Sequence, residues 1–179
     1  MRRLLVVGLM LTLSISLTGL AVGFEGTVYY KDKTGWEQGL AEPFTTYETE
    51  DFTDTLLNDG ISYDSSESGG INTKFGYYHD VLSSYSQNAP MTQWFFDTPI
   101  YAYGGTWTLG GPGGSGNYLR VYINEISEDN FVGYVNNGYN NEFMGFVSKV
   151  PFTSVLLVGG TGTNQQIYKL DDMVYSFAE

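Results

Sequence analysis

Apolar residues along this chain come in short runs, separated by clusters of glycine, asparagine, aspartate and proline. No long stretch repeats its apolar positions about every 3.6 residues, as an amphipathic helix would. The run 118–124 alternates instead, which places Leu119, Val121 and Ile123 on one face of an extended strand and Arg120 on the other. This pattern predicts an all-β fold in which that strand is half buried.

A second run, 154–158, is almost continuously apolar and is bounded by Pro151 and Gly159. A continuously apolar run is typical of a strand that is covered on both faces of its sheet. About ten strands in roughly 150 residues predict a two-sheet jelly-roll sandwich that forms a single domain over 24–179. The other predicted strands lie around 27–30, 44–52, 61–64, 72–78, 93–96, 131–135, 142–147 and 166–177.

Composition narrows the classes of partner. The 179 residues carry a formal net charge of -12, which repels a nucleic-acid backbone, and no basic cluster offsets it. The chain has no cysteine, which excludes disulfides and thiolate metal sites. Aromatic residues make up 16% of the sequence, enough to expect a packed core with several rings left for the surface.

The first 23 residues have the three parts of a signal peptide. Arg2 and Arg3 precede the apolar stretch 4–20, and the small residues of 21–23 match a cleavage site before Phe24. The stretch is shorter than the roughly 20 apolar residues of a membrane span and contains four hydroxyl side chains. We therefore expect a secreted, extracellular protein with no stable membrane anchor after the signal peptide is cleaved.

Four segments resemble a β-sandwich domain found in bacterial exported proteins of the PEP-CTERM (exosortase-sorted) type. No Pro-Glu-Pro sorting motif follows the last of them, so the resemblance implies the domain without exosortase processing. The resemblance also implies an association with extracellular polysaccharide and biofilm. It is a better guide to the fold than to the function. The four segments are Trp36 with 44–52, then 95–107, 143–155 and 168–175.

The adjacent acids Asp171 and Asp172 interrupt an apolar run, where a charge is costly unless it is paired or coordinates a cation. The pair is similar to acidic pairs in the closing strand of jelly-roll carbohydrate-binding modules, where one member ligates a structural calcium. The resemblance implies a calcium site completed by Glu50 and Asp51, with Glu25 as another candidate partner. The alternative is that the pair caps a bulge by accepting backbone N–H groups.

A sugar site would need exposed aromatic rings together with amides that bond hydroxyl groups. The polar turn 136–141 brings Tyr139 together with Asn137 and Asn140, and Tyr103 and Trp107 are further candidates for a platform. The alternative is that these rings fill the space between the two sheets, which is the usual place of large aromatic residues in a sandwich. We expect an exposed ring at Tyr139 in particular.

Catalysis has little support in the sequence. His79 is the only histidine, and no nucleophile-elbow motif accompanies it. The segment 125–129 contains three acids but does not match the active-site strand of the secreted sandwich glucanases, which favours a solvated turn.

The sequence therefore predicts a non-catalytic module that binds extracellular polysaccharide. The alternatives are a structural or adhesive matrix protein and a glycoside hydrolase with an unrecognised pair of carboxylates. The oligomeric state and the identity of the glycan are not determined by the sequence.

Overall fold

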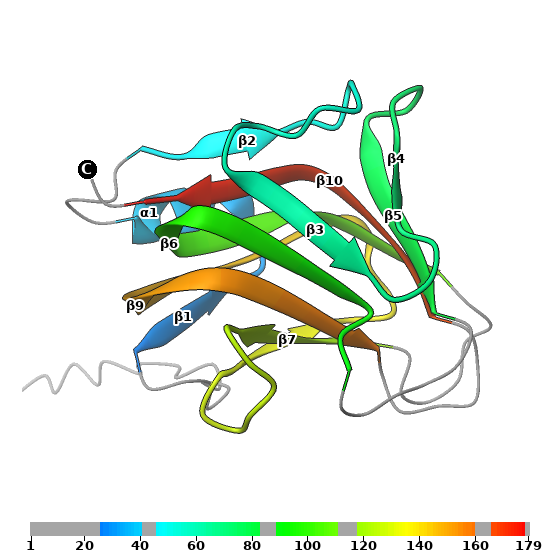
Figure 1. Cartoon of the computed structure of the whole chain (residues 1–179). Coiled ribbons are helices and arrows are strands. Elements are labelled where there is room, and N and C mark those ends of the chain that lie inside the picture. The colour runs from blue at the N-terminus through cyan, green and yellow to red at the C-terminus, as the bar shows by residue number, and fades with distance from the viewer. Residues whose placement is uncertain (1–25, 41–45, 83–88, 111–117, 160–165, 178–179) are drawn as a thin grey trace, which may run out of the picture.

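The computed structural model (Figure 1) describes residues 26–40, 46–82, 89–110, 118–159 and 166–177. The predicted signal peptide, its cleavage site before Phe24 and the candidate ligand Glu25 lie outside the described residues. The described part contains one helix, α1 (Lys33–Gly39), and ten strands. These are β1 (Thr27–Tyr30), β2 (Glu48–Glu50), β3 (Ile61–Ser65), β4 (Gly70–Asn72), β5 (Tyr77–Leu82), β6 (Thr92–Gly110), β7 (Leu119–Ile123), β8 (Phe131–Val135), β9 (Asn140–Gly159) and β10 (Gln166–Ser176).

All ten strands belong to one antiparallel sheet with the order β4-β5-β10-β6-β9-β7-β8. The order contains seven of the ten strands, and the other three each pair with one of them: β1 with β9, β2 with β10 and β3 with β6. The long strands β6 and β9 each take part in two sections of the sheet. In the first section, residues 102–110 of β6 and 140–147 of β9 join β1, β2, β4, β5 and β10. In the second section, residues 92–96 of β6 and 152–159 of β9 join β3, β7 and β8.

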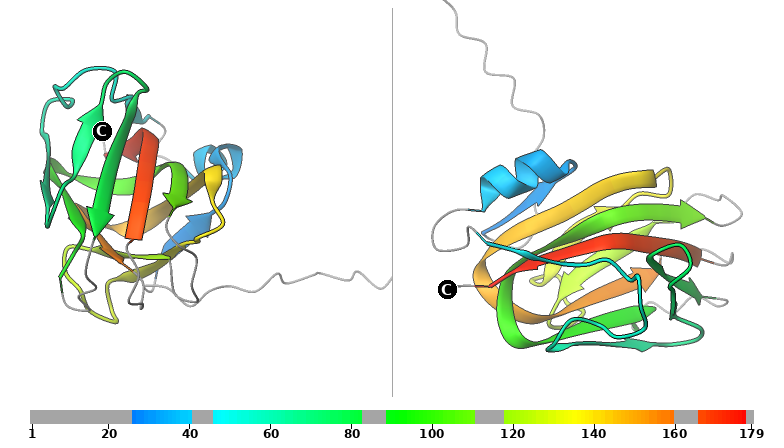
Figure 2. Two further views of the ribbon diagram at one scale, coloured as in Figure 1. Left: turned by 90° about the vertical axis from the view of Figure 1, so that its right-hand side faces the viewer. Right: turned by 90° about the horizontal axis from the view of Figure 1, so that it is seen from above.

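The two sections face each other across the main core. Tyr78 on β5 in the first section and Trp94 on β6 in the second are both fully buried, and their ring centroids are 4.8 Å apart. Figure 2 shows the long strands curving between the two sections. The structure confirms the all-β class, because every described element except α1 is a strand. The jelly-roll connection stays a prediction.

The pattern on β7 and β9 is confirmed. Leu119, Val121 and Ile123 are buried in the main core, as their alternation predicts. On the opposite face of the second section, Tyr122 packs with Leu156 and Val158 of β9 in a separate small cluster. Strand β9 is thus covered on both sides over this stretch, in agreement with its continuous apolar sequence.

Several strand boundaries differ from the predicted ones. β6 continues through Pro99, and β9 continues through Pro151, which was predicted to bound a strand. The pairing of these two strands shifts register on both sides of Ile100, close to both prolines. A proline lacks the N–H that a regular ladder needs, and the irregular stretch between the two sections accommodates it. The predicted strand 72–78 is also wrong, since residues 73–76 form the turn between β4 and β5.

Helix α1 was not predicted. It begins after Asp32, whose side chain accepts a hydrogen bond from the N–H of Gly35 at 2.7 Å. Trp36 in its middle is fully buried against Ala102 and Val174 on the outer face of the first section, and its indole N–H donates to the carbonyl of Phe146 at 3.1 Å. Figure 2 shows the helix beside β1 and β9. Within the described residues, no helix has the length and apolar content that crossing a membrane requires.

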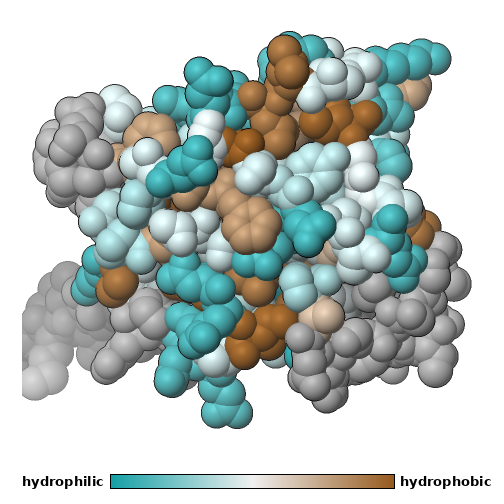
Figure 3. Space-filling model, in the orientation of Figure 1, coloured by the Kyte–Doolittle hydropathy of each residue, from teal (hydrophilic) through white to brown (hydrophobic). Residues whose placement is uncertain are grey.

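On the face shown in Figure 3, hydrophilic and hydrophobic residues are interspersed, and the hydrophobic ones gather in small groups only. Scattered exposed apolar residues are normal for a soluble domain. The large hydrophobic residues that the described surface exposes are Val28, Leu56, Phe75, Phe95, Tyr134 and Val150.

Candidate functional site

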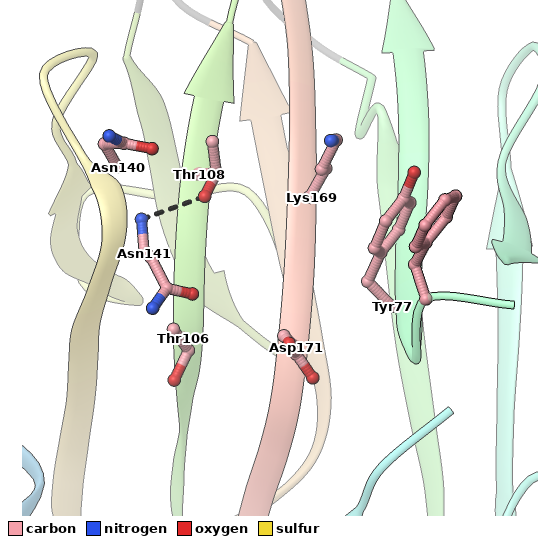
Figure 4. Close-up of a pocket in the computed structure, with 8 residues that line it drawn as sticks. Tyr77, Thr106, Thr108, Asn140, Asn141, Lys169 and Asp171 are labelled. Carbon is pink, nitrogen blue, oxygen red and sulfur yellow. Dashed lines mark hydrogen bonds between the residues drawn. The ribbon is translucent and has the colours of Figure 1, made fainter. Parts of the chain in front are cut away.

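A groove of about 440 Å³ crosses four strands on the outer face of the first section. It is open to solvent and lies on the part of this face that α1 does not contact (Figure 4). Its lining combines two aromatic rings with hydroxyl, amide, ammonium and carboxylate groups. The lining residues are Phe75, Tyr77, Thr106, Thr108, Asn140, Asn141, Lys169 and Asp171.

The strand register explains why these side chains share one face. Lys169 on β10 lies opposite Thr108 of β6, and Asp171 lies opposite Thr106. Directly paired residues of an antiparallel sheet point to the same side. The intervening Leu170 therefore points to the opposite side, where it is fully buried in the main core. Alternation along β10 and β6 thus produces a polar outer face and an apolar inner face from the same strands.

Two aromatic rings form one end of the groove. Phe75, in the turn between β4 and β5, is 62% exposed, and its ring is nearly parallel to that of Tyr77, with an interplanar angle of 6° and centroids 6.2 Å apart. The turn is closed by Asn72, whose carbonyl accepts from the N–H of Gly76, and Gly76 has a φ of 65° that favours glycine. The ammonium of Lys169 lies 4.6 Å from the ring centroid of Tyr77, within cation–π range.

Two asparagines form the opposite end. Asn140 and Asn141 begin β9, at a register shift against Trp107 and Thr108. Asn141 has a φ of 62°, and its backbone N–H donates to the hydroxyl of Thr108 at 2.9 Å. Both asparagines are exposed, and neither side-chain amide makes a hydrogen bond with another described residue. Their donors and acceptors are therefore available to a ligand, and Figure 4 shows them beside Thr106 and Thr108.

Asp171 is the one carboxylate among the residues that line the groove. It sits at a bulge in β10, where the register with β6 shifts before Val174 and Asp172 adopts a φ of 46°. Its carboxylate accepts the N–H of Asp172 at 2.8 Å, as in the bulge-capping alternative. Burial raises the pKa of the Asp171 carboxyl, and the neighbouring carboxylates Asp172 and Asp51 raise it further.

The predicted calcium ligands are brought together only in part. Strand β2 pairs with β10, so that Glu50 lies opposite Met173, and the early acidic strand is a neighbour of the closing strand as predicted. The side chain of Glu50, however, is buried and accepts the N–H groups of Phe52 and Asn58 at 2.9 and 2.7 Å. Asp51, the next residue, points into solvent.

Consecutive residues of an extended chain point to opposite sides, which explains why Glu50 and Asp51 do not converge. Asp51 accepts the N–H and the hydroxyl of Thr53 at 2.9 and 2.7 Å, and these bonds lower the pKa of its carboxyl. In the described part of the chain, no group of three or more His, Cys, Asp or Glu side chains is arranged to hold a metal ion. The predicted calcium site therefore stays a prediction.

The predicted aromatic platform is corrected. Tyr103 and Trp107 are fully buried, and the indole N–H of Trp107 donates to the carbonyl of Met144 at 3.2 Å. Tyr139, expected to be exposed, is only 7% exposed, and its hydroxyl lies 3.3 Å from that of Tyr29. All three rings belong to the main core between the two sections. Tyr103 and Trp107 point inward because side chains alternate along β6.

Of the predicted ligand-binding residues, Asn140 lines the groove and Asn137 does not. The other residues that line the groove were not predicted to form a site, although Tyr77 belongs to an aromatic run in the sequence. A signal was present: Thr106, Thr108, Lys169 and Asp171 alternate with apolar residues, and so mark outer faces. Nothing in the sequence shows that these faces adjoin. No protein family, curated protein or solved structure matches this chain, so the groove is interpreted from its own chemistry.

Proposed function

We propose that this protein is a secreted, non-catalytic module of the jelly-roll type that binds an extracellular polysaccharide in the groove. The segment 1–23 would direct export. The single observation that supports binding is the arrangement in the groove, where the rings of Phe75 and Tyr77 lie at one end and the free amides of Asn140 and Asn141 at the other.

Sugars present both an apolar ring face and a rim of hydroxyl groups, and the groove offers a partner for each. The nearly parallel rings of Phe75 and Tyr77 supply flat apolar surface. Thr106, Thr108 and the asparagine amides supply donors and acceptors to hydroxyl groups. A volume of about 440 Å³ lies within the range of small-ligand sites and suits a short stretch of a glycan.

The number of carboxyl groups among the described lining residues of the groove favours binding over hydrolysis. Glycosidases use two carboxyl groups roughly 5 to 10 Å apart on either side of the scissile bond. Among the described residues that line the groove, Asp171 alone carries a carboxyl group. It belongs to β10, and its carboxylate already accepts a hydrogen bond from the N–H of Asp172.

A glycan array followed by calorimetry with the best-bound oligosaccharide tests this function. Tyr77→Ala and Asn140→Ala should each weaken binding by about tenfold, because each removes one of the two kinds of contact that the proposal assigns to the sugar. Phe95→Ala is the matched control, since Phe95 is an exposed ring on β6 in the second section. If no glycan binds, or if Tyr77→Ala binds like the wild type, the groove is not a sugar site and an adhesive matrix role becomes the better explanation.

A structural calcium remains part of the proposal, with one member of the Asp171–Asp172 pair, Asp51 as the early-strand acid and backbone carbonyls as its ligands. Glu50 is left out of this set because its carboxylate already accepts two backbone N–H groups. A thermal melt with calcium and then with chelator tests it, because a ligand that binds only the folded state raises stability. A shift that Asp171→Asn and Asp172→Asn abolish would support the ion, whereas no shift at millimolar calcium would exclude it.

A further inference from the structure

Arg120 lies on the outer face of the second section, which points away from the groove. It is half-buried on β7, where the strand register places it opposite Tyr134 of β8 and Val158 of β9. Paired residues share a face, so these three side chains lie together. Tyr122 lies two residues further along β7 on the same face, and its ring centroid is 5.9 Å from the guanidinium carbon of Arg120.

The guanidinium has no acidic partner in the described part of the chain. It makes two hydrogen bonds, to the Tyr122 hydroxyl and to the Gly159 carbonyl, and both are 3.5 Å long, at the weak limit for such bonds. Its Nε is buried and has no partner among the described residues. The adjoining segments 111–117 and 160–165 contain no Asp or Glu.

Composition does not account for the missing acidic partner, because the chain has 20 acidic and only 8 basic residues. Charged groups that leave water are normally paired with an opposite charge. The cation of Arg120 therefore has unused capacity for an anion, in a planar donor geometry that matches a carboxylate.

Aromatic rings surround this cation. The rings of Tyr118 and Tyr134 meet edge to face with centroids 4.8 Å apart, and Phe131 lies 4.9 Å from Tyr134 on its other side. Tyr134 is 43% exposed, so part of its ring is free for contact. A cation next to an exposed, hydroxyl-bearing ring combines the two features that an anionic sugar would contact.

We propose that Arg120, Tyr118 and Tyr134 form a second binding site, which takes a sugar carrying an anionic group. The guanidinium binds the carboxylate of a uronic acid or a sulfate ester, and the Tyr134 ring packs against the sugar. This site is separate from the groove and does not depend on its function. Because the two sections face each other across the core, the two sites lie on opposite outer faces. One molecule that uses both sites could join two glycan chains.

The net charge of the chain affects how strongly this site binds an anionic sugar. A charge of -12 repels a polyanion at long range, but at physiological ionic strength charges beyond about 8 Å are largely screened. The contact with Arg120 acts within that distance. Added salt should therefore weaken the binding of an acidic probe more than that of a neutral one at the groove.

Calorimetry on the purified protein with tri-galacturonate, a sulfated disaccharide and neutral cellotriose tests the proposal. Arg120→Met keeps the apolar stem and removes the charge, and it should weaken binding of the acidic probes by about tenfold or more. Arg120→Lys keeps the charge without the planar fork and should lose less. A carboxylate source is indicated if Arg120→Lys weakens tri-galacturonate more than the sulfated sugar, and a sulfate source by the reverse.

Two variants keep the test decisive. Tyr134→Ala removes a partly exposed ring, should lower the melting temperature only slightly and should weaken binding of the acidic probes. It therefore applies even if Arg120→Met unfolds the protein. Lys169→Met removes the cation of the groove and should leave the acidic probes unaffected. The proposal is wrong if neither acidic probe shows saturable binding, if Tyr134→Ala and Arg120→Met bind like the wild type, or if Lys169→Met alone abolishes binding. A result for cellotriose in Tyr77→Ala reports on the groove separately.

Discussion

The outer face of the first section has two halves that share strands β6, β9 and β10 but differ in what covers them. One half lies under α1, where Trp36 packs on Ala102, Val174, Phe143 and Val147. The other half is the groove, where the same three strands present polar side chains to solvent. The boundary on β10 is the bulge between Asp171 and Val174.

This difference shows that backbone pairing alone does not decide the use of a sheet face. On β10 the outward residues are Lys169 and Asp171 before the bulge, and Val174 after it. On β6 they are threonines in the open half and Ala102 in the covered half. The apolar half gains stability by burying area against a helix, whereas the polar half keeps its groups free for a ligand.

The largest expected effect is on the covered half. Trp36→Ala should lower the free energy of unfolding by about 3 to 5 kcal/mol, because it empties a fully buried site and loses the bond to Phe146. Tyr77→Ala in the open half should cost far less, since Tyr77 is only half-buried. Urea unfolding of both variants measures the contrast. Equal losses would mean that the groove is also a structural element.

A smaller effect concerns the close approach of α1 to β9. A Cβ added at Gly145 would lie 2.8 Å from Cδ1 of Trp36 and 2.9 Å from Cζ of Phe143. Gly145→Ala should therefore destabilise the protein by about 1 to 3 kcal/mol through overpacking. Gly110→Ala on β6 is the matched control, because nothing lies within 4 Å of its added Cβ. A thermal melt in which both variants match the wild type would show that α1 is not packed closely.

Within the groove, two substitutions of Asn141 can separate the effect of its backbone conformation on stability from the effect of its side-chain amide on binding. Its φ of 62° is strained for most residues, so Asn141→Ala should cost about 1 kcal/mol of stability and Asn141→Gly should not. Both variants remove the amide, and both should weaken glycan binding to a similar extent. Melting and calorimetry on the pair resolve the two roles. Normal binding by Asn141→Gly would show that the amide does not contact the ligand.

The smallest expected effect is a pair of opposite pH dependences. The raised pKa of Asp171 means that its folded form holds a proton to a higher pH than the unfolded chain, so stability falls as the pH rises above 3.8. The lowered pKa of Asp51 has the reverse consequence: its contribution is present above 3.8 and is lost as the pH falls through its folded pKa.

At neutral pH, Asp171→Asn should therefore raise the melting temperature slightly and Asp51→Asn should lower it. Both differences should disappear in strong acid, where the two carboxyl groups are protonated in the folded and unfolded states alike. Melts of the two variants across the pH range check this. Shifts of the same sign at neutral pH would contradict the assigned environments.

Much of the fold followed from local pattern, and its errors have local causes. The alternation at 119–123 predicted both the strand and its buried face, and the apolar run at 155–158 predicted cover on both sides. Helix α1 was missed because its seven residues are too few to show a helical period and include two glycines. The strand boundary predicted at Pro151 is wrong because β9 continues through it, although a proline normally ends a strand.

The candidate site could be predicted much less well. Tyr139 was expected at a ligand surface and Trp107 was a candidate for one, yet both side chains are buried in the main core. The acidic strands β2 and β10 were correctly expected to be neighbours, but Glu50 turns inward to bind the N–H groups of Phe52 and Asn58. A side-chain hydrogen bond to a nearby turn leaves no trace in residue spacing.

The sequence by itself determined the all-β class, the faces of individual strands and the strongly acidic character, because each depends on residues close together in the chain. Only the tertiary structure decided which faces adjoin. The groove joins Tyr77, Thr108, Asn140 and Lys169 from four strands. Such long-range pairing depends on how the whole sheet folds around its core, so the groove is a property of the fold and not of any one segment.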